Sequence, residues 1–166
     1  MSQLVALSLS IGILGAVATF VFLQFMPSYL IWAAFIAWAC YFATGGNTDA
    51  LKKTITCNIF GAFCAWVAAV LIVSIPATNV TIALIVGATV LVMCLAAHVA
   101  ALSTIPASVY GYASVFGFLL GKGSLTKEAL LSATPANALI AVGASMVVGA
   151  IFGMLSGKMG AALTKK

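Results

Sequence analysis

The sequence contains very few charged residues. Two acids, Asp49 and Glu128, stand beside seven lysines, arginine is absent, and charged residues make up only 5% of the 166 positions. A soluble protein of this length needs far more polar side chains to cover its surface. The shortage of charge therefore excludes an ordinary soluble protein, and the length predicts a single domain over residues 1–166.

Catalytic and metal-binding side chains are equally scarce. One histidine, two separated acids and scattered serines form no catalytic triad, no HExxH motif and no nucleophile elbow. The cysteines all lie inside apolar segments without metal-ligand spacing, so we interpret them as buried free thiols. These are Cys40, Cys57, Cys64 and Cys94. We therefore expect no enzyme, no cofactor and no metal site.

Apolar residues are abundant instead. They make up 64% of the chain, and the mean hydropathy is +1.27. Backbone in lipid satisfies its hydrogen bonds only in helices or closed barrels. The apolar runs lack the period-two alternation of a barrel strand. The sequence therefore predicts an all-α, polytopic membrane protein with one transmembrane domain.

The excess of lysine indicates a lipid partner rather than nucleic acid. The net charge is +5, and the lysines lie at the edges of apolar segments and in the tail. Anchoring at an anionic membrane surface explains this placement. The N-terminus lacks the basic residues of a signal peptide, so we expect the first helix to be retained.

One pattern occurs twice in the chain, at Pro27 to Leu51 and again at Pro106 to Leu130. Each copy contains a proline, an aromatic-rich apolar run, a glycine turn and an acid followed by Ala-Leu. The two copies are 79 residues apart (from 27 to 106) and align without a gap. We predict a duplicated unit, with repeat one at about 1–79 and repeat two at about 80–166.

Six apolar segments are predicted, at residues 4–25, 28–43, 48–75, 81–102, 108–120 and from 126 onward. The second and fifth are short for a hydrocarbon layer of about 30 Å, so they either span a thinned bilayer or re-enter. Pro27 and Pro106 are predicted to break the chain and start these short helices. Pro135 is predicted to kink or delay the sixth segment.

Six crossings place both termini on one side of the membrane. With cytoplasmic termini, five lysines lie inside and two, Lys122 and Lys127, lie outside. Re-entrant short segments would give four inside and three outside, so the positive-inside rule favours six crossings. Three crossings per unit also predict that the two repeats are inverted.

Two kinds of polar side chain are candidates for a solute path. Asn58 and Asn137 match under the repeat spacing, and each amide either serves a neutral solute or joins helices. His98 is the single histidine of the sequence, and it either lines a polar path or bonds a backbone carbonyl near a helix end.

Aromatic side chains follow both proline breaks, where transporters often build solute sites on discontinuous helices. They are Tyr29, Trp32, Phe42, Tyr112 and Phe116. They form either the flat walls of a narrow pore or an ordinary aromatic belt and core. With no buried carboxylate for ion coupling, we predict a passive channel or facilitator for a small, uncharged solute.

A rival hypothesis rests on the glycines of the last segment. Gly149, Gly153 and Gly157 repeat every four residues and form a stripe that allows close helix contact. We expect a homo-oligomer, a dimer or a trimer, with a glycine face at a subunit contact. On the rival hypothesis the chain is a structural or accessory membrane protein that docks a partner through such faces.

Two runs of residues carry a family resemblance. LIWAAF at 30–35 with ACYFATGG at 39–46, and IPA at 105–107 with YGYA at 110–113, resemble the signatures of the YcdZ-like family. The resemblance implies six apolar segments in a bacterial inner membrane, with no established substrate and no catalytic residues. The duplicated plan is also similar in architecture to urea transporters, without a shared motif.

Overall fold

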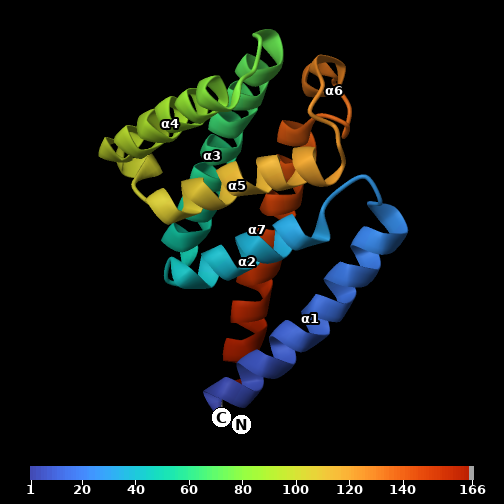
Figure 1. The fold of residues 1–166 in the computed structure, drawn as a ribbon. Helices are drawn as coiled ribbons and strands as arrows, with labels where there is room; N and C mark the ends of the chain where they lie inside the picture. Colours follow the sequence, from blue (N-terminus) through green and yellow to red (C-terminus); the bar gives the residue numbers. More distant parts are fainter. Residues whose placement is uncertain (165–166) are drawn as a thin grey trace.

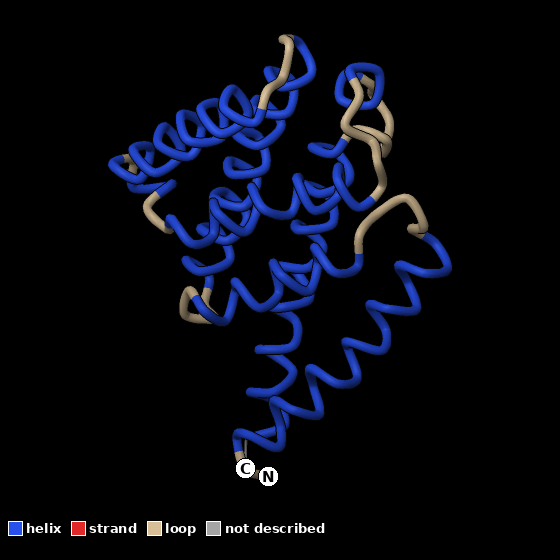
Figure 2. Tube along the Cα trace, in the orientation of Figure 1, coloured by secondary structure: helices blue, strands red, loops and turns tan. Residues whose placement is uncertain are grey.

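The computed structural model describes residues 1–164 and is all-helical over that range, with 82% helix and no strand (Figures 1 and 2). The helices are α1 (Gln3–Phe25), α2 (Ile31–Ala43), α3 (Thr48–Ser74), α4 (Asn79–Leu95), α5 (Ile105–Gly121), α6 (Lys127–Leu131) and α7 (Ala138–Thr164). The 3-10 turns η1 (Ala96–His98) and η2 (Ala100–Leu102) join α4 to α5. The predicted tail lysines Lys165 and Lys166 lie outside the described residues.

The repeat spacing holds at one pair of helix starts. The side chains of Asn47 and Thr126, which are 79 positions apart, accept hydrogen bonds from the backbone N–H groups of Ala50 and Ala129. Such caps satisfy a backbone N–H group that has no partner inside the first turn. The duplicated pattern therefore codes for the same local structure at the start of α3 and α6.

The two repeats diverge immediately afterwards. α3 continues without interruption for 27 residues, whereas α6 stops after 5 and α7 begins only at Ala138. Pro135 lies in the break, and a proline inside a helix removes a backbone hydrogen bond. The prediction of one sixth segment from 126 onward is therefore wrong, whereas the predicted delay at Pro135 is confirmed.

The predicted start of the second segment is also wrong. α2 begins at Ile31, four positions after Pro27, because residues 26–30 form a turn in which Tyr29 N–H donates to the Met26 carbonyl at 2.9 Å. Pro27 ends α1 as expected but does not open α2. By contrast, Pro106 lies in the first turn of α5, as a proline at a helix start should.

The fourth and fifth segments differ from their predicted lengths. α5 has 17 residues rather than the 13 predicted for 108–120. The helix begins at Ile105, one position before Pro106, and it ends at Gly121. The residues predicted to end the fourth segment, 96–102, form the two 3-10 turns instead of continuing α4. The chain therefore turns toward α5 earlier than its hydropathy indicates.

Helices of the two halves interleave. α3 and α7 contact each other, α5 packs mainly on α3, and α2 packs mainly on α7. The peripheral helices follow the same rule, since α1 packs on α7 and α4 packs on α3. In Figure 1, α1 and α3 run upward while α4 and α7 run downward, and the chain termini lie together at the bottom.

Four helical stretches are long and apolar enough to cross a membrane: α1, α3, α4 with η1, and α7. In the most apolar 18 residues of each stretch, only 17% of those in α1 and 6% of those in the α4 stretch are buried, against 50% in α3 and in α7. The exposed side chains on α1 and α4 include Leu4, Phe20, Leu23, Val80, Leu84 and Leu91. Exposing so much apolar surface to water is unfavourable, so the fold fits a membrane-embedded protein.

The start of α2 provides a stability prediction. The buried N–H of Leu30 donates to Ser145 Oγ of α7 at 2.9 Å. Replacing Ser145 with alanine leaves this N–H group without its acceptor and should cost about 1–3 kcal/mol in unfolding free energy. The matched control is Thr164→Ala, because within residues 1–164 that hydroxyl bonds only to Gly160 of its own helix. Equal unfolding midpoints for both variants in detergent would show that the Leu30 contact contributes nothing.

Candidate functional site at the crossing of α3 and α5

The crossing of α3 and α5 brings two backbones into direct contact. A methyl group at Gly61 would collide with the backbone of Ser108, and one at Gly111 would collide with the backbone of Asn58. Each helix therefore has a polar residue followed three positions later by a glycine. Each glycine contacts the backbone of the polar residue on the other helix. Close backbone approach at small residues is a common way for helices to associate in lipid.

Polar groups at this crossing are buried without hydrogen bonds. Within residues 1–164, both amide atoms of Asn58 and the hydroxyl of Ser108 have no partner, and neither has the hydroxyl of Ser114 further along α5. Asn58 is 0% exposed, and the two serines are each 1% exposed. An unsatisfied buried polar group costs about 1–3 kcal/mol. Such a group in a folded protein calls for an explanation, and a polar ligand or water is the usual one.

The corresponding crossing of α2 and α7 differs in its polar groups. Gly149 meets the backbone of α2, so the close contact is similar. There, however, Ser145 Oγ accepts the Leu30 N–H, and Ser156 Oγ accepts the Nε1–H of Trp38 at 2.8 Å. These polar groups hold helices together and need no further partner. This contrast selects the α3–α5 crossing as the candidate site.

A line of polar side chains leads to Asn58 from the turn between α2 and α3. Thr54 lies one helical turn before Asn58 on α3 and is 0% exposed. Its Oγ1 lies 3.1 Å from Thr44 Oγ1 in the turn, and it donates to Cys40 Sγ at 3.7 Å. All four cysteines are free thiols, and Cys40 packs with Cys57. Cys40, Cys57 and Cys64 are buried as predicted, whereas the prediction is wrong for Cys94, which is only half-buried.

Asn137 has a different environment from its repeat partner. Its Nδ2 donates to the carbonyls of Leu130 at 2.8 Å and Ser132 at 3.0 Å, and its Oδ1 accepts the Leu139 N–H at 2.9 Å. These bonds tie the end of α6 to the start of α7. The amide of Asn137 is thus engaged in the fold, and only Asn58 of the predicted pair presents free polar atoms.

The predicted aromatic residues do not form one slot. Trp32 is 38% exposed, and its ring lies beside Gly117 of α5. Tyr112 is buried, with its hydroxyl 2.9 Å from Thr89 Oγ1 of α4. Phe116 lies against Tyr112, with ring centroids 5.4 Å apart. These rings join α2 and α4 to α5 rather than facing each other across an opening.

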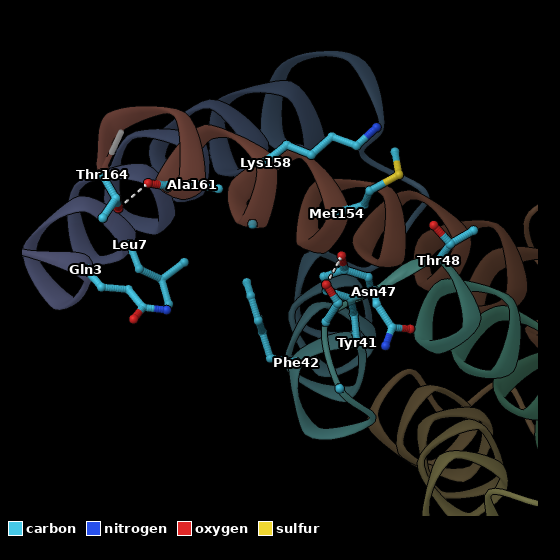
Figure 3. Close-up of a pocket in the computed structure, with 14 residues that line it drawn as sticks. Gln3, Leu7, Tyr41, Phe42, Asn47, Thr48, Met154, Lys158, Ala161 and Thr164 are labelled. Carbon is cyan, nitrogen blue, oxygen red and sulfur yellow. Dashed lines mark hydrogen bonds between the residues drawn. The ribbon is translucent and has the colours of Figure 1, made fainter. Parts of the chain in front are cut away.

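The remaining predicted residues are also dispersed. Tyr29 is half-buried in the turn before α2, and His98 is exposed at the end of η1. Phe42 lines a cavity of about 760 Å³ near the chain termini, between α1, α7 and the α2–α3 turn (Figure 3). We call it the terminal cavity. A second groove, of about 690 Å³, is lined by apolar side chains of α3 and α7 and contains none of the predicted residues.

The glycine stripe of α7 lies largely inside the chain. Gly149 contacts the backbone of Ala34, and a methyl group at Gly153 would lie 3.0 Å from Tyr41. Gly157 lines the terminal cavity. The close contact with α2 leaves no room for a neighbouring copy at Gly149 or Gly153.

Sequence reasoning missed Thr54 and Ser114, and it did not pair Ser108 with Asn58. The signal for that pairing is present as a matched spacing, Asn58-x-x-Gly61 and Ser108-x-x-Gly111. The repeat spacing hid it, because that spacing pairs Asn58 with Asn137 rather than with a residue of α5.

An all-helical fold with exposed apolar helices and buried polar groups defines a membrane-type protein. The family model described as "Protein of unknown function (DUF1097)" matches residues 8–161, and the chain belongs to this family. No curated protein and no solved structure matches the chain. The family membership of an uncharacterised domain is thus established, whereas the YcdZ-like name and the likeness to urea transporters stay predictions.

Proposed function

We propose that the chain is a membrane channel or facilitator for a small, uncharged polar solute that passes the α3–α5 crossing. The observation that carries the proposal is the fully buried Asn58 amide, which has no hydrogen-bond partner within residues 1–164. In a lipid-embedded helix such a group is costly unless it faces something polar. A passing solute supplies that partner.

The chemistry of the site favours a solute that both donates and accepts hydrogen bonds. The Asn58 amide offers two donors and an acceptor, and the hydroxyls of Ser108 and Ser114 serve in either role. No carboxylate lies at the crossing, so a strong cation would lack compensation there. Short amides, urea and small alcohols match the donor and acceptor set, and their passage requires no covalent chemistry.

We further propose an inverted duplication. The supporting observations are the exchanged packing, in which each short helix lies on the long helix of the other half, and the opposite directions of α1 and α4 and of α3 and α7 (Figure 1). A pseudo-two-fold axis in the membrane plane would produce both features. The differing polar groups then mean that only one of the two crossings, that of α3 and α5, keeps the solute site.

We also propose that the chain crosses a bacterial inner membrane six times, with both termini in the cytoplasm. Single-cysteine labelling tests the six crossings. In a variant without the four native cysteines, exposed Ser2, Lys52 and Ala77 are each replaced by cysteine in turn. Six crossings predict that positions 2 and 52 react with impermeant maleimide from one face and position 77 from the other. If the short helices re-enter instead, position 77 reacts from the same face as position 2, and position 52 reacts from the opposite face.

Transport itself is tested in proteoliposomes loaded with urea, short amides or small alcohols, with volume followed by stopped-flow light scattering. The proposal predicts at least one solute that equilibrates faster than in protein-free liposomes. Flux at the protein-free rate across the whole panel would leave the rival role as a structural or accessory protein. The rival is favoured by the open face of α1, where Gly12 has no atom within 4 Å of an added methyl group, and a homo-oligomeric contact fits that face.

A further inference from the structure

We propose that the terminal cavity is a specific binding site for an anionic phospholipid. Its walls come from Gln3 and Leu7 of α1, Phe42 of α2, Asn47 of the α2–α3 turn and Lys158 of α7 (Figure 3). This assignment is independent of solute transport, because the cavity contains neither Asn58 nor the serines of the α3–α5 crossing.

The charge around the cavity favours an anion. Among the described residues, Lys158 is the one lining residue with a charged side chain, and exposed Lys52 lies one turn after Thr48, another lining residue. The nearby acid, Asp49, is paired with Lys53 at 3.0 Å. The other acid, Glu128, is on α6 at the end of the molecule away from the termini (Figure 1). The net field at the cavity is therefore positive, as lipid-headgroup sites require.

Neutral donors also line the cavity, Gln3 on the α1 side and Asn47 at the α2–α3 turn (Figure 3). Asn47 Oδ1 is occupied by the Ala50 N–H at 2.9 Å, whereas its Nδ2 group makes no hydrogen bond within the described residues. Thr48 and Gln3 add a hydroxyl and a second amide to the lining. A phosphate oxygen accepts hydrogen bonds from all of these groups, and a lysine supplies the charge.

The rest of the lining is mostly apolar, which identifies a lipid rather than a soluble anion. Figure 3 shows Leu7 on one side of the cavity, Met154 on the α7 side and Phe42 standing between the helices. Gly157 and Phe42 both line the cavity, and an added methyl group at Gly157 would touch the rings of Phe42 and Tyr41 at 3.7 Å and so take up part of this space. The upper part of an acyl chain fills this space, next to α1, whose outer face contacts lipid.

The test is native mass spectrometry of the full chain in mild detergent, titrated with phosphatidylglycerol or phosphatidylcholine. We expect retained phosphatidylglycerol and little phosphatidylcholine. Lys158→Gln should weaken phosphatidylglycerol binding about fivefold, the effect of one lysine near a headgroup. Gly157→Leu fills the acyl space and should also lower retention, although every charge remains. Lys127→Gln, at the far end of the molecule, is the matched control and should bind like the parent.

Three outcomes would overturn the assignment. Equal losses for Lys127→Gln and Lys158→Gln would mean diffuse attraction to the whole basic surface. Unchanged binding in both Lys158→Gln and Gly157→Leu would place the lipid elsewhere. If soluble glycerol phosphate protected the parent protein against thermal unfolding as well as phosphatidylglycerol does, the cavity would be a site for a soluble anion and not for a lipid. Lys158 is exposed, so its variant should fold and the comparison stays interpretable.

Discussion

Replacing Gly111 with alanine should destabilise the protein by about 3 kcal/mol, because the new methyl group collides with the backbone of Asn58. Backbone cannot move aside as a flexible side chain does, so α3 and α5 must separate along their whole contact. The same result is expected for Gly61→Ala, whose methyl group meets the backbone of Ser108. Unfolding in mixed micelles, followed by circular dichroism, measures the loss.

Gly87→Ala is the matched control for these two variants. Gly87 lies in α4, and an added methyl group there meets no atom within 4 Å. Alanine in an open helical position should be neutral or stabilise the protein by up to about 1 kcal/mol. If Gly111→Ala were as stable as Gly87→Ala, the two helices could not cross as closely as described.

The second large effect is a change in stability that has opposite signs for the two repeat-matched asparagines, Asn58 and Asn137. Asn58→Leu should raise the unfolding free energy by about 1–3 kcal/mol, because an apolar side chain of similar size removes an unsatisfied buried amide. Asn137→Leu should lower it by a similar amount, because it breaks the three hydrogen bonds that hold α6 to α7. Equal destabilisation of both variants would show that Asn58 has a structural partner and would contradict its role in solute binding.

The membrane class could be predicted from the sequence because it depends on total composition. With 64% apolar residues, no arrangement of the chain could cover itself with polar groups. The break at Pro135 was also predictable, because proline acts on its own helix. The start of α2 was not, since it depends on Ser145, 115 positions from Leu30 in the sequence.

The candidate site could be predicted only in part, for a similar reason. Asn58 is recognisable as a polar residue in an apolar run, but its partners come from α5, which the repeat spacing does not align with it. Whether an asparagine is free or engaged depends on its neighbours in space. Asn58 and Asn137 have the same spacing from their repeat starts, yet a turn occupies one amide and a helix crossing leaves the other free.

The most direct test of the solute site is a paired flux measurement on the parent protein and Asn58→Leu in the same proteoliposomes. For any solute that the parent carries, Asn58→Leu should reduce passage to the rate of protein-free liposomes while its unfolding midpoint stays the same or rises. Parent-like flux through a correctly folded Asn58→Leu variant would contradict the account, because the solute would then cross without the buried side-chain amide that lacks a partner within residues 1–164.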